Sequence, residues 1–389
     1  MRLLYVTEQV PTRDPVFGNG SSLIPYEVIR ALPTDVVITL LSFEEGLSVP
    51  AEIIDRCTDI VLLAKRTVRH GGVGTMQEVV SPLSTGARER ATREARTTVG
   101  RLSAAHDLTL LHGSHIATLA HSVTGPVILQ VIDPWSMTVG MEAKLTSGWR
   151  SVYRLVKARQ ARRLEERLPR RARLLTVSST DARQWSHQIH REVGVVANGT
   201  HPSPGRKSRP ADPTVCFVGS LNYLPNVESA TVLIRDIAPR VWERDPAVRF
   251  VLAGRQPGPA IRALAGSRVT VMADVPSIED VLHGAHVAAF PDTQGVGVRN
   301  SVQEALAVGV TVVATSAAAR GQEPDDLLTI VDDRAAFADA VLARLDARNG
   351  SRPGDGTRRH MRDWHDVATD YVAEFAQTAR GSGSARDTA

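Results

Sequence analysis

The chain has 389 residues, 42% of them hydrophobic and 23% charged, and a formal net charge of +4. This composition is that of a folded globular protein and excludes long disordered regions away from the ends. One hydrophobic core rarely grows beyond roughly 250–300 residues, so the length predicts two domains. No apolar run approaches the ~20 residues that span a bilayer, so any membrane contact is expected to be peripheral.

The first half of the chain alternates short apolar runs with helical patterns. Leu3–Val6 predicts a strand, a loop with Gly18-Asn19-Gly20 follows, and a helix is expected from Ser22 to Leu32. Such a strand-loop-helix unit is typical of a parallel sheet. Further strands are expected at Val36–Leu41, Ile60–Leu63, Leu108–His112, Val127–Val131 and Leu174–Val177, and helices at Ala87–Ala105 and Trp149–Leu168.

The second half repeats this alternation after residues 199–213, a segment rich in Pro, Gly, Ser and Arg that predicts an interdomain linker. Short strands separated by helical patterns indicate an open parallel sheet with helices on both faces. The strands are expected at Val215–Val218, Arg249–Ala253, Val269–Met272, Val287–Phe290 and Thr311–Ala314, and the helices at Asn226–Val241, Ala260–Leu264, Ile278–His283, Asn300–Ala307 and from Ala335 to about Ala376.

These patterns predict an α/β protein with two tandem Rossmann-like, doubly wound parallel-sheet domains. The expected divisions are an N-terminal domain at 1–198, a C-terminal domain at 214–355, a helix at 356–378 that packs back on the N-terminal domain, and a disordered tail at 379–389. Ligands of such sheets bind outside the carboxyl ends of the strands, where the strand order reverses. With two such domains, a cleft between them is the default site.

The cysteines and the basic residues indicate the cellular environment of the protein and the partners it is expected to lack. Cys57 and Cys216 fit no metal or redox spacing, so a reducing, cytoplasmic environment is expected. Cys216 lies in an apolar run and is expected to be a core residue. The arginine-rich stretch Arg150–Arg173 lacks interleaved aromatic pairs, so a solvated helix face is favoured over a nucleic-acid site. No signal peptide is expected at the N-terminus.

Three glycine-containing loops of the second half follow predicted strands. Gly219-Ser220-Leu221-Asn222 opens a helix and is either a pyrophosphate cradle or an ordinary turn. Gly254-Arg255 puts an arginine at a strand end, where it either pairs with a phosphate or is solvated. The run from Gly295 to Asn300 leads into a helix whose amides and dipole favour a diphosphate. Glu304, about one turn further, can accept hydrogen bonds from both hydroxyls of a ribose, as acidic residues do in dinucleotide folds.

The order and spacing of these loops resemble the C-terminal half of GT-B retaining glycosyltransferases of family 4. The resemblance extends over about Val215–Leu345, and the N-terminal half is similar only in outline. The runs that carry it are Phe217-Val218-Gly219, Tyr223-Leu224-Pro225-Asn226, Leu252–Pro257, Gly295–Asn300 and Glu304–Gly309, and Asn198-Gly199 is similar to the interdomain motif of the family.

The resemblance implies a nucleotide-diphosphate-sugar donor that is bound by the C-terminal domain and reacts with retention at the anomeric carbon, without a metal. Arg299 and the glycine turn would face the diphosphate, Glu304 would hold the ribose, and Val275 would line the base. The donor contacts expected on this basis are Gly219, Ser220, Asn222, Arg255, Val275, Gly295, Val296, Gly297, Val298, Arg299, Asn300 and Glu304.

Two departures from the family pattern fall within this site. Many members carry a Glu-x7-Glu pair, but Val296 stands eight residues before Glu304. The variant with Gly-x-Gly-x-Arg-Asn often continues with Lys, where this chain has Ser301. A carboxylate and a cation are therefore absent, and Arg255, Arg299 or Lys207 would have to supply the positive charge near the diphosphate.

The acceptor side has fewer candidates. Asp133 follows a predicted strand and is either an acid that contacts hydroxyls or takes a proton, or a turn residue before Pro134. His112 and His115, at another strand end, either contact the acceptor or are structural. The expected catalytic residues are Asp133, His112 and Arg299, and the expected acceptor contacts are Gly18, Asn19, Gly20, His115 and Trp135.

The sequence thus predicts a retaining, metal-independent glycosyltransferase of bacterial polysaccharide or secondary-metabolite biosynthesis, with a nucleotide-sugar donor and a small-molecule or glycan acceptor. We expect no cofactor, no metal and no nucleic-acid partner, and a homodimer is left open. A nucleotide-sugar epimerase or phosphorylase and a non-catalytic binding protein remain alternatives. A dinucleotide-dependent oxidoreductase is disfavoured because no Gly-x-Gly-x-x-Gly follows the first strand of either half.

Overall fold

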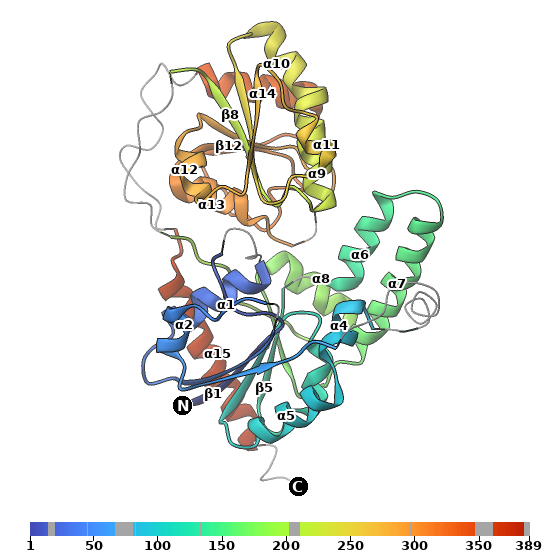
Figure 1. The fold of residues 1–389 in the computed structure, drawn as a ribbon, viewed down its shortest axis with the longest axis vertical. Coiled ribbons are helices and arrows are strands. Elements are labelled where there is room, and N and C mark those ends of the chain that lie inside the picture. The colour runs from blue at the N-terminus through green and yellow to red at the C-terminus, as the bar shows by residue number, and fades with distance from the viewer. Residues whose placement is uncertain are drawn as a thin grey trace. The chain divides into compact units, whose positions relative to one another are not determined.

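The computed structural model describes residues 1–14, 20–44, 46–66, 81, 83–132, 134–201, 211–295, 297–346 and 361–384. The chain divides into two compact units, an N-terminal unit of Met1–Gly199 with Trp364–Ala389 and a C-terminal unit of Thr200–Asp363. Each unit contains a parallel sheet covered by helices (Figure 1). The α/β fold class with two parallel-sheet domains is confirmed.

The N-terminal unit is built on a seven-stranded sheet in the order β3-β2-β1-β4-β5-β6-β7. All its strand pairs are parallel, and β4 is buried along its whole length, as expected for an apolar run covered on both faces. The short β7 is not predicted by the sequence pattern. The strands are β1 (Arg2–Thr7), β2 (Val37–Phe43), β3 (Asp59–Leu63), β4 (Leu108–His112), β5 (Val127–Ile132), β6 (Arg173–Thr176) and β7 (Gly194–Val195).

Helices cover both faces of this sheet and form two separate core clusters. On one face α1 and α15 pack against alternate residues of the strands, with Tyr371 and Phe375 of α15 in contact with the layer that contains Tyr5. On the other face α5, η1 and α8 pack, and Trp185 of α8 is fully buried. The helices are α1 (Gly20–Ala31), α2 (Ala51–Arg56), α4 (Thr85–Arg90), α5 (Arg93–Ser103), η1 (Ala117–Ser122), α6 (Trp135–Lys144), α7 (Trp149–Glu166), α8 (Ser179–Ile189) and α15 (Trp364–Ser384).

One helix prediction and the prediction of a disordered tail are wrong for this unit. The helix expected at Ala87–Ala105 is broken into α4 and α5, because Thr92 leaves the helical conformation and its hydroxyl caps α5 by accepting a hydrogen bond from the Ala95 amide at 3.1 Å. The tail expected to be disordered from residue 379 is helical as far as Ser384. Residues 385–389 lie outside the described part of the chain.

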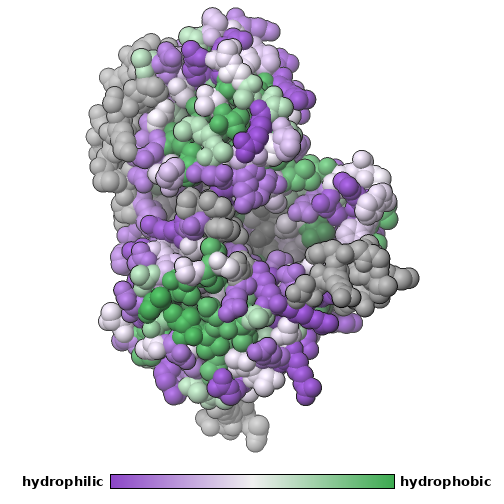
Figure 2. Space-filling model, in the orientation of Figure 1, coloured by the Kyte–Doolittle hydropathy of each residue, from purple (hydrophilic) through white to green (hydrophobic). Residues whose placement is uncertain are grey.

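The edge strand β3 leaves apolar side chains half-exposed. Its middle residues, Ile60, Val61 and Leu62, are only partly buried, whereas Leu63 is buried. In the view of Figure 2, hydrophobic side chains gather over the lower left of the N-terminal unit, where Figure 1 draws α2 and the neighbouring edge of the sheet. An edge strand has one neighbour instead of two, so this partial exposure follows from its position.

The C-terminal unit has a six-stranded parallel sheet in the order β10-β9-β8-β11-β12-β13. The strands are β8 (Thr214–Val218), β9 (Arg249–Gly254), β10 (Val269–Ala273), β11 (Val287–Phe290), β12 (Thr311–Ala314) and β13 (Leu328–Ile330). Only the last, a three-residue strand, is absent from the sequence prediction. The helices are α9 (Leu224–Val232), η2 (Leu233–Ile237), α10 (Ala238–Arg244), α11 (Pro259–Arg262), α12 (Ile278–His283), α13 (Asn300–Val308) and α14 (Arg334–Asp346).

The helix predicted at Asn226–Val241 is present but contains a π-helical segment. The amide of Ala238 donates to the carbonyl of Leu233, five residues earlier, and Pro239 comes directly after it. Pro239 has no backbone amide and therefore cannot make the usual α-helical hydrogen bond to the residue four positions earlier. The wider π-helical turn accommodates this missing hydrogen bond. The helix expected from Ala335 to about Ala376 is not continuous, because α14 ends at Asp346 and residues 361–363 are not helical.

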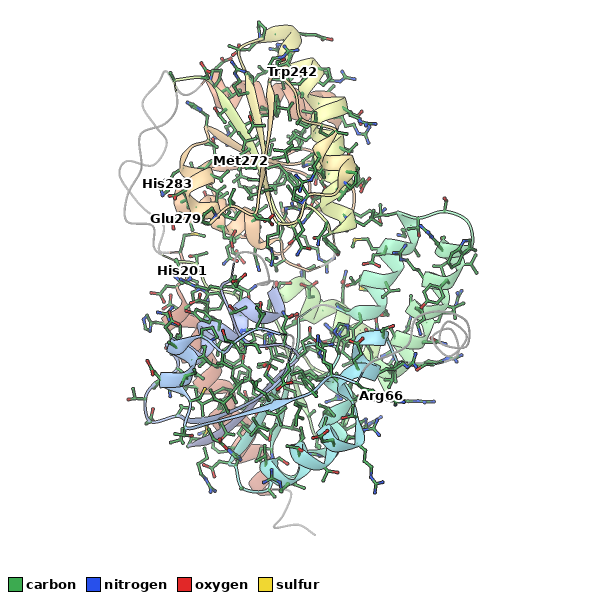
Figure 3. The ribbon with its side chains drawn as sticks, in the orientation of Figure 1. Arg66, His201, Trp242, Met272, Glu279 and His283 are labelled. Atoms are coloured by element: carbon green, nitrogen blue, oxygen red, sulfur yellow. The ribbon has the colours of Figure 1, made fainter. Side chains whose placement is uncertain are left out.

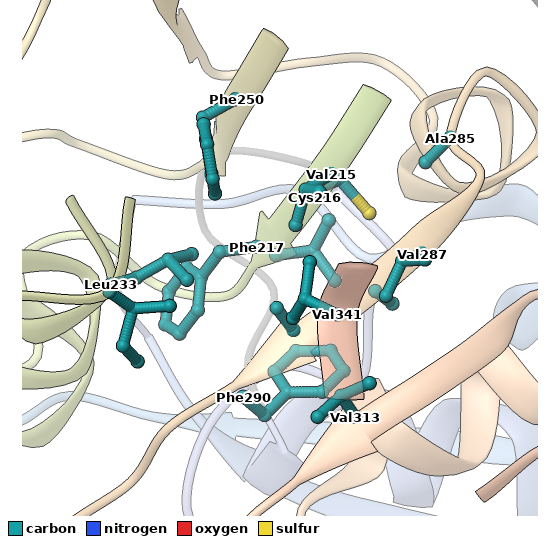
Figure 4. Packing of buried hydrophobic residues seen from close by; sticks show 14 of the residues in the cluster. Val215, Cys216, Phe217, Leu233, Phe250, Ala285, Val287, Phe290, Val313 and Val341 are labelled. Atoms are coloured by element: carbon teal, nitrogen blue, oxygen red, sulfur yellow. The ribbon is translucent and has the colours of Figure 1, made fainter. Parts of the chain in front are cut away.

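Aromatic side chains fill the core of the C-terminal unit. Phe217 of β8 and Phe290 of β11 lie with their ring centroids 5.8 Å apart, beside the fully buried Cys216 (Figure 4). Cys216 is the core residue that the sequence predicts. The ring of Trp242, which Figure 3 labels, meets Phe250 edge-on. The contact between Phe217 and Phe290 joins β8 and β11, and these two strands carry the site described next.

Candidate functional site

Each sheet has one point where the strand order reverses, between β8 and β11 in the C-terminal unit and between β1 and β4 in the N-terminal unit. Chain connections leave such a point in opposite directions, so the loops after the two strands diverge and expose backbone amides. In the C-terminal unit these loops carry the predicted donor contacts. The site is therefore described from the carboxyl ends of β8 and β11 outward.

Two glycines bring the ends of β8 and β9 together. A Cβ atom at Gly254 would lie 1.7 Å from the carbonyl oxygen of Gly219, so no side chain fits there. A Cβ atom at Gly219 would lie 2.9 Å from the amide nitrogen of the Asn226 side chain. That side chain donates to the Ser220 carbonyl at 3.0 Å and fixes the loop. The structure thus brings Gly219 and Ser220 against the end of β9.

The loop after β9 is tied to the loop after β8 by side-chain hydrogen bonds. Arg255 donates from Nη2 to the Ser220 hydroxyl at 2.8 Å. Asn222 donates to Gln256 at 2.7 Å, and the Gln256 amide donates to Asp274 at 2.9 Å. Gln256 and Asp274 both have positive φ, 48° and 51°, an uncommon conformation that residues at binding sites often adopt.

Val275 continues this edge of the sheet. It directly follows Asp274 and is partly buried against the core of the C-terminal unit. An apolar side chain at that position offers a surface on which a base can lie. The predicted base contact and the predicted phosphate contacts therefore stand on adjacent strand ends, β10 and β9.

The glycine turn after β11 packs closely on the loop after β12. A Cβ atom at Gly295 would lie 2.3 Å from the carbonyl oxygen of Ala317, and Gly297 has φ +75°. Val298 is half-buried, and Val296 lies outside the described residues. Only glycine fits the first position without displacing backbone, and glycine adopts the second at little cost. The turn delivers the chain to Arg299 and to the start of α13.

Arg299 is held by an ion pair and by two aromatic rings. Its Nη1 pairs with a carboxylate oxygen of Asp292 at 2.5 Å, and its guanidinium lies 5.0 Å and 4.8 Å from the ring centroids of Phe217 and Phe290. Its Nε and Nη2 atoms are buried and have no hydrogen-bond partner among the described residues. Asp292, which the sequence pattern did not single out as a site residue, thus neutralises the charge predicted to face the diphosphate.

Asn300 begins α13, and Arg299 occupies the cap position before it. The Arg299 side chain makes no capping hydrogen bond, and the Val302 amide donates to the Arg299 carbonyl at 3.1 Å. The first amides of a helix carry a partial positive charge that favours an anion. The start of α13 can therefore hold a phosphate whether or not the Arg299 side chain contacts it.

Glu304 lies on the second turn of α13 as a half-buried carboxyl group. No described residue donates a hydrogen bond or pairs with it, and its neighbour Ala305 is fully buried. Removal from water disfavours the charged form, and this burial raises the pKa of Glu304 to about 7. A carboxyl group with this environment is suited to ligand hydroxyls that donate to it.

The raised pKa predicts that nucleotide binding depends on pH. If ribose hydroxyls donate to Glu304, they stabilise its carboxylate form, so the ligand binds best above pH 7 and affinity falls by up to about tenfold per pH unit below it. Isothermal titration with a nucleotide-diphosphate sugar between pH 5.5 and 8.5 measures this, because its diesterified diphosphate does not titrate there. An affinity that is flat over this range would contradict the assignment.

In the N-terminal unit, Glu8 lies where the strand order reverses, directly after β1. The amide of His115 donates to a Glu8 carboxylate oxygen at 3.0 Å, and the His115 ring lies 3.4 Å from the same oxygen. Burial acts to raise the pKa of Glu8, but the bonds from His115 and Ser21 outweigh it and lower the pKa to about 2. Gly113 leaves the space for this carboxylate, because a Cβ atom there would meet it. The sequence pattern did not single out Glu8 as a site residue, although Glu8 directly follows β1.

Three other predicted acceptor-side residues lie within the described chain, His112 at the end of β4, Trp135 at the start of α6 and Gly20 at the start of α1. His112 pairs with Thr7, the residue before Glu8. His112 is fully buried, its ring nitrogens have no partner among the described residues, and burial lowers its pKa to about 4, so it is neutral. Trp135 packs edge-on against Trp185, with ring centroids 6.0 Å apart. Gly20 is the exposed first residue of α1. The described residues do not include Gly18, Asn19 and Asp133.

No group of three His, Cys, Asp or Glu side chains suited to a metal ion occurs among the described residues. Likewise, none of the described helices combines the length and the apolar content needed to cross a bilayer.

Comparison with known proteins places the candidate donor site within a matched region. Residues 212–347 match the family described as Glycosyl transferases group 1, and this range includes every predicted donor contact. No curated protein matches the chain by sequence.

Solved structures resemble the chain over its whole length. The Anabaena protein HepE in complex with UDP-glucose aligns with a TM-score of 0.59 at 12% identity and covers 100% of both chains. The chain has the GT-B fold. A glycosyltransferase from Rickettsia africae aligns with a TM-score of 0.59 at 10% identity, over 98% of this chain and 93% of the other. A trehalose 6-phosphate synthase from Burkholderia multivorans gives 0.56 at 13% identity, over 99% and 98%.

Proposed function

We propose that the protein is a glycosyltransferase whose C-terminal unit binds a nucleotide-diphosphate sugar. The observation that carries the proposal is the set of groups at and beside the reversal point of β8 and β11. They are the close-packed glycine turns, the amides at the start of α13, Arg255 after β9 and the Glu304 carboxyl group, which has no partner among the described residues. The match of residues 212–347 to Glycosyl transferases group 1 supports it. The UDP-glucose complex of HepE, which has the same fold, supports the donor class.

The groups at the ends of β8, β9 and β11 are complementary to the diphosphate and the ribose of a nucleotide-diphosphate sugar. In the proposal the diphosphate lies at the start of α13 and near Arg255, and the ribose donates to Glu304. The bond from the anomeric carbon to the phosphate oxygen breaks, and its electron pair leaves with the diphosphate. Preorganised amides and a cation stabilise the charge that develops there. This stabilisation can replace a metal ion, so we propose a metal-independent transfer.

Retention at the anomeric carbon is the finer part of the proposal. It rests on the resemblance of Gly295–Asn300 and Glu304 to the retaining family. The acceptor oxygen would approach the anomeric carbon from the face that the diphosphate leaves, form the new bond there and give its proton to the departing diphosphate. No covalent enzyme nucleophile would take part. The acceptor would bind to the N-terminal unit, whose reversal point carries Glu8 and His115.

Thermal stabilisation by nucleotides tests the donor site. A ligand that binds only the folded state raises the melting temperature by mass action. We expect one of UDP, GDP, ADP, CDP and dTDP to raise it clearly, and the shift to be the same with magnesium and with EDTA. A shift that needs magnesium would contradict the metal-independent proposal, and no shift with any nucleotide would favour a non-catalytic binding protein.

Product analysis then separates transfer from its alternatives. With the sugar nucleotide that binds, we expect a new glycoside only when an acceptor is present, and the proton spectrum of its anomeric centre should show the donor configuration. An epimerised sugar nucleotide without acceptor, or a sugar phosphate formed with inorganic phosphate, would replace the transferase proposal by an epimerase or a phosphorylase.

A further inference from the structure

The helix α7 forms a hairpin with α6 (Figure 1) and carries a stripe of exposed hydrophobic side chains. Trp149, Val152, Leu155 and Val156 are 73%, 62%, 43% and 38% exposed. Spacings of three, four and seven residues place these side chains on one side of a helix. The other large hydrophobic side chains that are exposed in the described chain are scattered over separate elements, so the stripe is the concentrated apolar surface among them.

The same side of α7 continues as a basic surface. Arg159 and Arg163 follow Val152 and Val156 by seven residues, or two turns, and both arginines are exposed. At the other end of the stripe, the guanidinium of Arg150 lies 5.7 Å from the centroid of the Trp149 ring. In Figure 2 the hairpin at the right carries both hydrophobic and hydrophilic side chains. An apolar band that borders arginines is the pattern of a helix that lies at a membrane interface.

Acidic side chains on α7 do not neutralise this surface. Glu166 pairs with Arg162 at 3.1 Å, one turn along the helix. Glu165 is the one buried residue of α7 and faces the opposite way, toward α6 and α8. No ion pair of Arg159 or Arg163 is found among the described residues. The exposed side of α7 is therefore apolar at its start and positively charged toward its end.

The hairpin is held rigidly at its base. Both oxygens of the Glu165 carboxylate accept from Ser136, one from its amide at 2.9 Å and the other from its hydroxyl at 2.7 Å. Gln188 of α8 donates to the same carboxylate. Together with the contact between Trp135 and Trp185, these bonds fix α6 and α7 to the body of the unit. A rigid hairpin presents the stripe without an ordering cost.

We propose that this face of α7 docks on an anionic phospholipid surface. Trp149 and the aliphatic side chains would enter the headgroup region, and the arginines would contact lipid phosphates. A second copy of the chain is disfavoured as the occupant, because a symmetric contact would bring two arginine surfaces together. The face also lacks the successive aromatic side chains on which nucleic-acid bases stack. The proposal does not depend on the proposed function, because lipid binding and nucleotide binding are measured separately.

Vesicle partitioning of the full chain tests the proposal. We expect binding to vesicles of phosphatidylcholine with phosphatidylglycerol, and little binding to phosphatidylcholine alone. The double substitution Arg159→Gln and Arg163→Gln should weaken partitioning about 30-fold, and added salt should have a similar effect. Arg235→Gln with Arg240→Gln removes the same charge from exposed positions in the C-terminal unit and should leave partitioning unchanged.

Hydrophobic insertion has its own readout. Trp149→Ala should weaken partitioning about tenfold, whereas Ile54→Ser, at an exposed position on α2, should not. Brominated acyl chains should quench the tryptophan fluorescence of the native chain, and Trp149→Phe should remove most of this quenching. Absence of vesicle binding at low salt, or equal binding of all these variants, would overturn the proposal. So would self-association of the native chain that Trp149→Ala abolishes, because the face would then join two copies.

Discussion

Replacing Glu304 by glutamine is expected to weaken the binding of a nucleotide-diphosphate sugar about 100-fold and, in the same variant, to raise the melting temperature above pH 7. The loss of affinity follows from hydrogen bonding. A carboxylate can accept from both ribose hydroxyls, whereas an amide has one acceptor oxygen and no charge. Hydrogen bonds to charged groups contribute about 1.5–3 kcal/mol each, and a loss of about 2.7 kcal/mol is a factor of 100 in affinity.

The gain in stability follows from the raised pKa of Glu304. Burial moves its pKa from 4.5 to about 7 in the folded chain, so the folded state favours the protonated form. The stability that this group contributes is present below its unfolded pKa and is lost as the pH rises through 7. Above pH 7 the native chain must keep a poorly solvated charge without a partner, and glutamine removes that charge. The increase in melting temperature should therefore shrink as the pH falls toward 4.5.

Opposite changes in binding and stability distinguish a ligand-binding carboxylate from a structural one. Differential scanning fluorimetry at pH 8 and pH 5, with and without the nucleotide sugar, measures both. Glu243→Gln on α10 is the matched control, because this exposed residue lies on another helix and should change neither quantity. If Glu304→Gln lowers the melting temperature at pH 8 and binds the ligand normally, Glu304 stabilises the fold and the ribose assignment is wrong.

The sequence predicts most of the strands because their residues are fully buried. β8 and β11 are almost entirely apolar, and β4 is apolar except for Thr109 and His112. The observed bounds of these three strands agree with the expected ones within one residue. β7 and β13 have two and three residues, which is too short for a pattern to distinguish them from a loop. The breaks between α4 and α5 and after α14 also went unpredicted. The cap at Thr92 depends on one hydrogen bond from the Ala95 amide to the Thr92 hydroxyl, and it does not interrupt the pattern of apolar residues around it.

The sequence pattern singled out the glycines of the candidate donor site, whereas it did not predict the electrostatics of this site. Gly219 directly follows β8, Gly254 ends β9 and Gly295 lies in the turn after β11. At Gly254 and Gly295 a close approach of backbone requires glycine. That Asp292 neutralises Arg299 depends on how the turn between them folds. The contact of Glu8 with His115 joins residues 107 positions apart, and only the pairing of β1 with β4 brings them together. Sequence spacing therefore singled out the glycines and Arg299, whereas the pairing of Arg299 with Asp292 and of Glu8 with His115 depends on the fold.

Replacing Gly254 by alanine is expected to destabilise the C-terminal unit by about 3 kcal/mol or more and to abolish nucleotide binding. The new methyl group would lie 1.7 Å from the Gly219 carbonyl oxygen, where no contact of this kind is tolerated, so β8 and β9 must separate. Their carboxyl ends carry Ser220 and Arg255, whose hydrogen bond depends on this approach. Overpacked sites typically lose 1–3 kcal/mol, and more where the contact is with backbone that cannot rotate away.

Chemical denaturation followed by tryptophan fluorescence, together with nucleotide titration, measures both effects of Gly254→Ala. Gly266→Ala is the matched control, because a Cβ atom at Gly266 has no other atom within 4 Å and its φ is not positive. The control should bind the nucleotide normally and should unfold within about 1 kcal/mol of the native chain. If Gly254→Ala also behaves in this way, the ends of β8 and β9 are further apart than the structure places them. Loss of binding with normal stability would instead show that the approach of Gly219 to Gly254 shapes the phosphate site without supporting the fold.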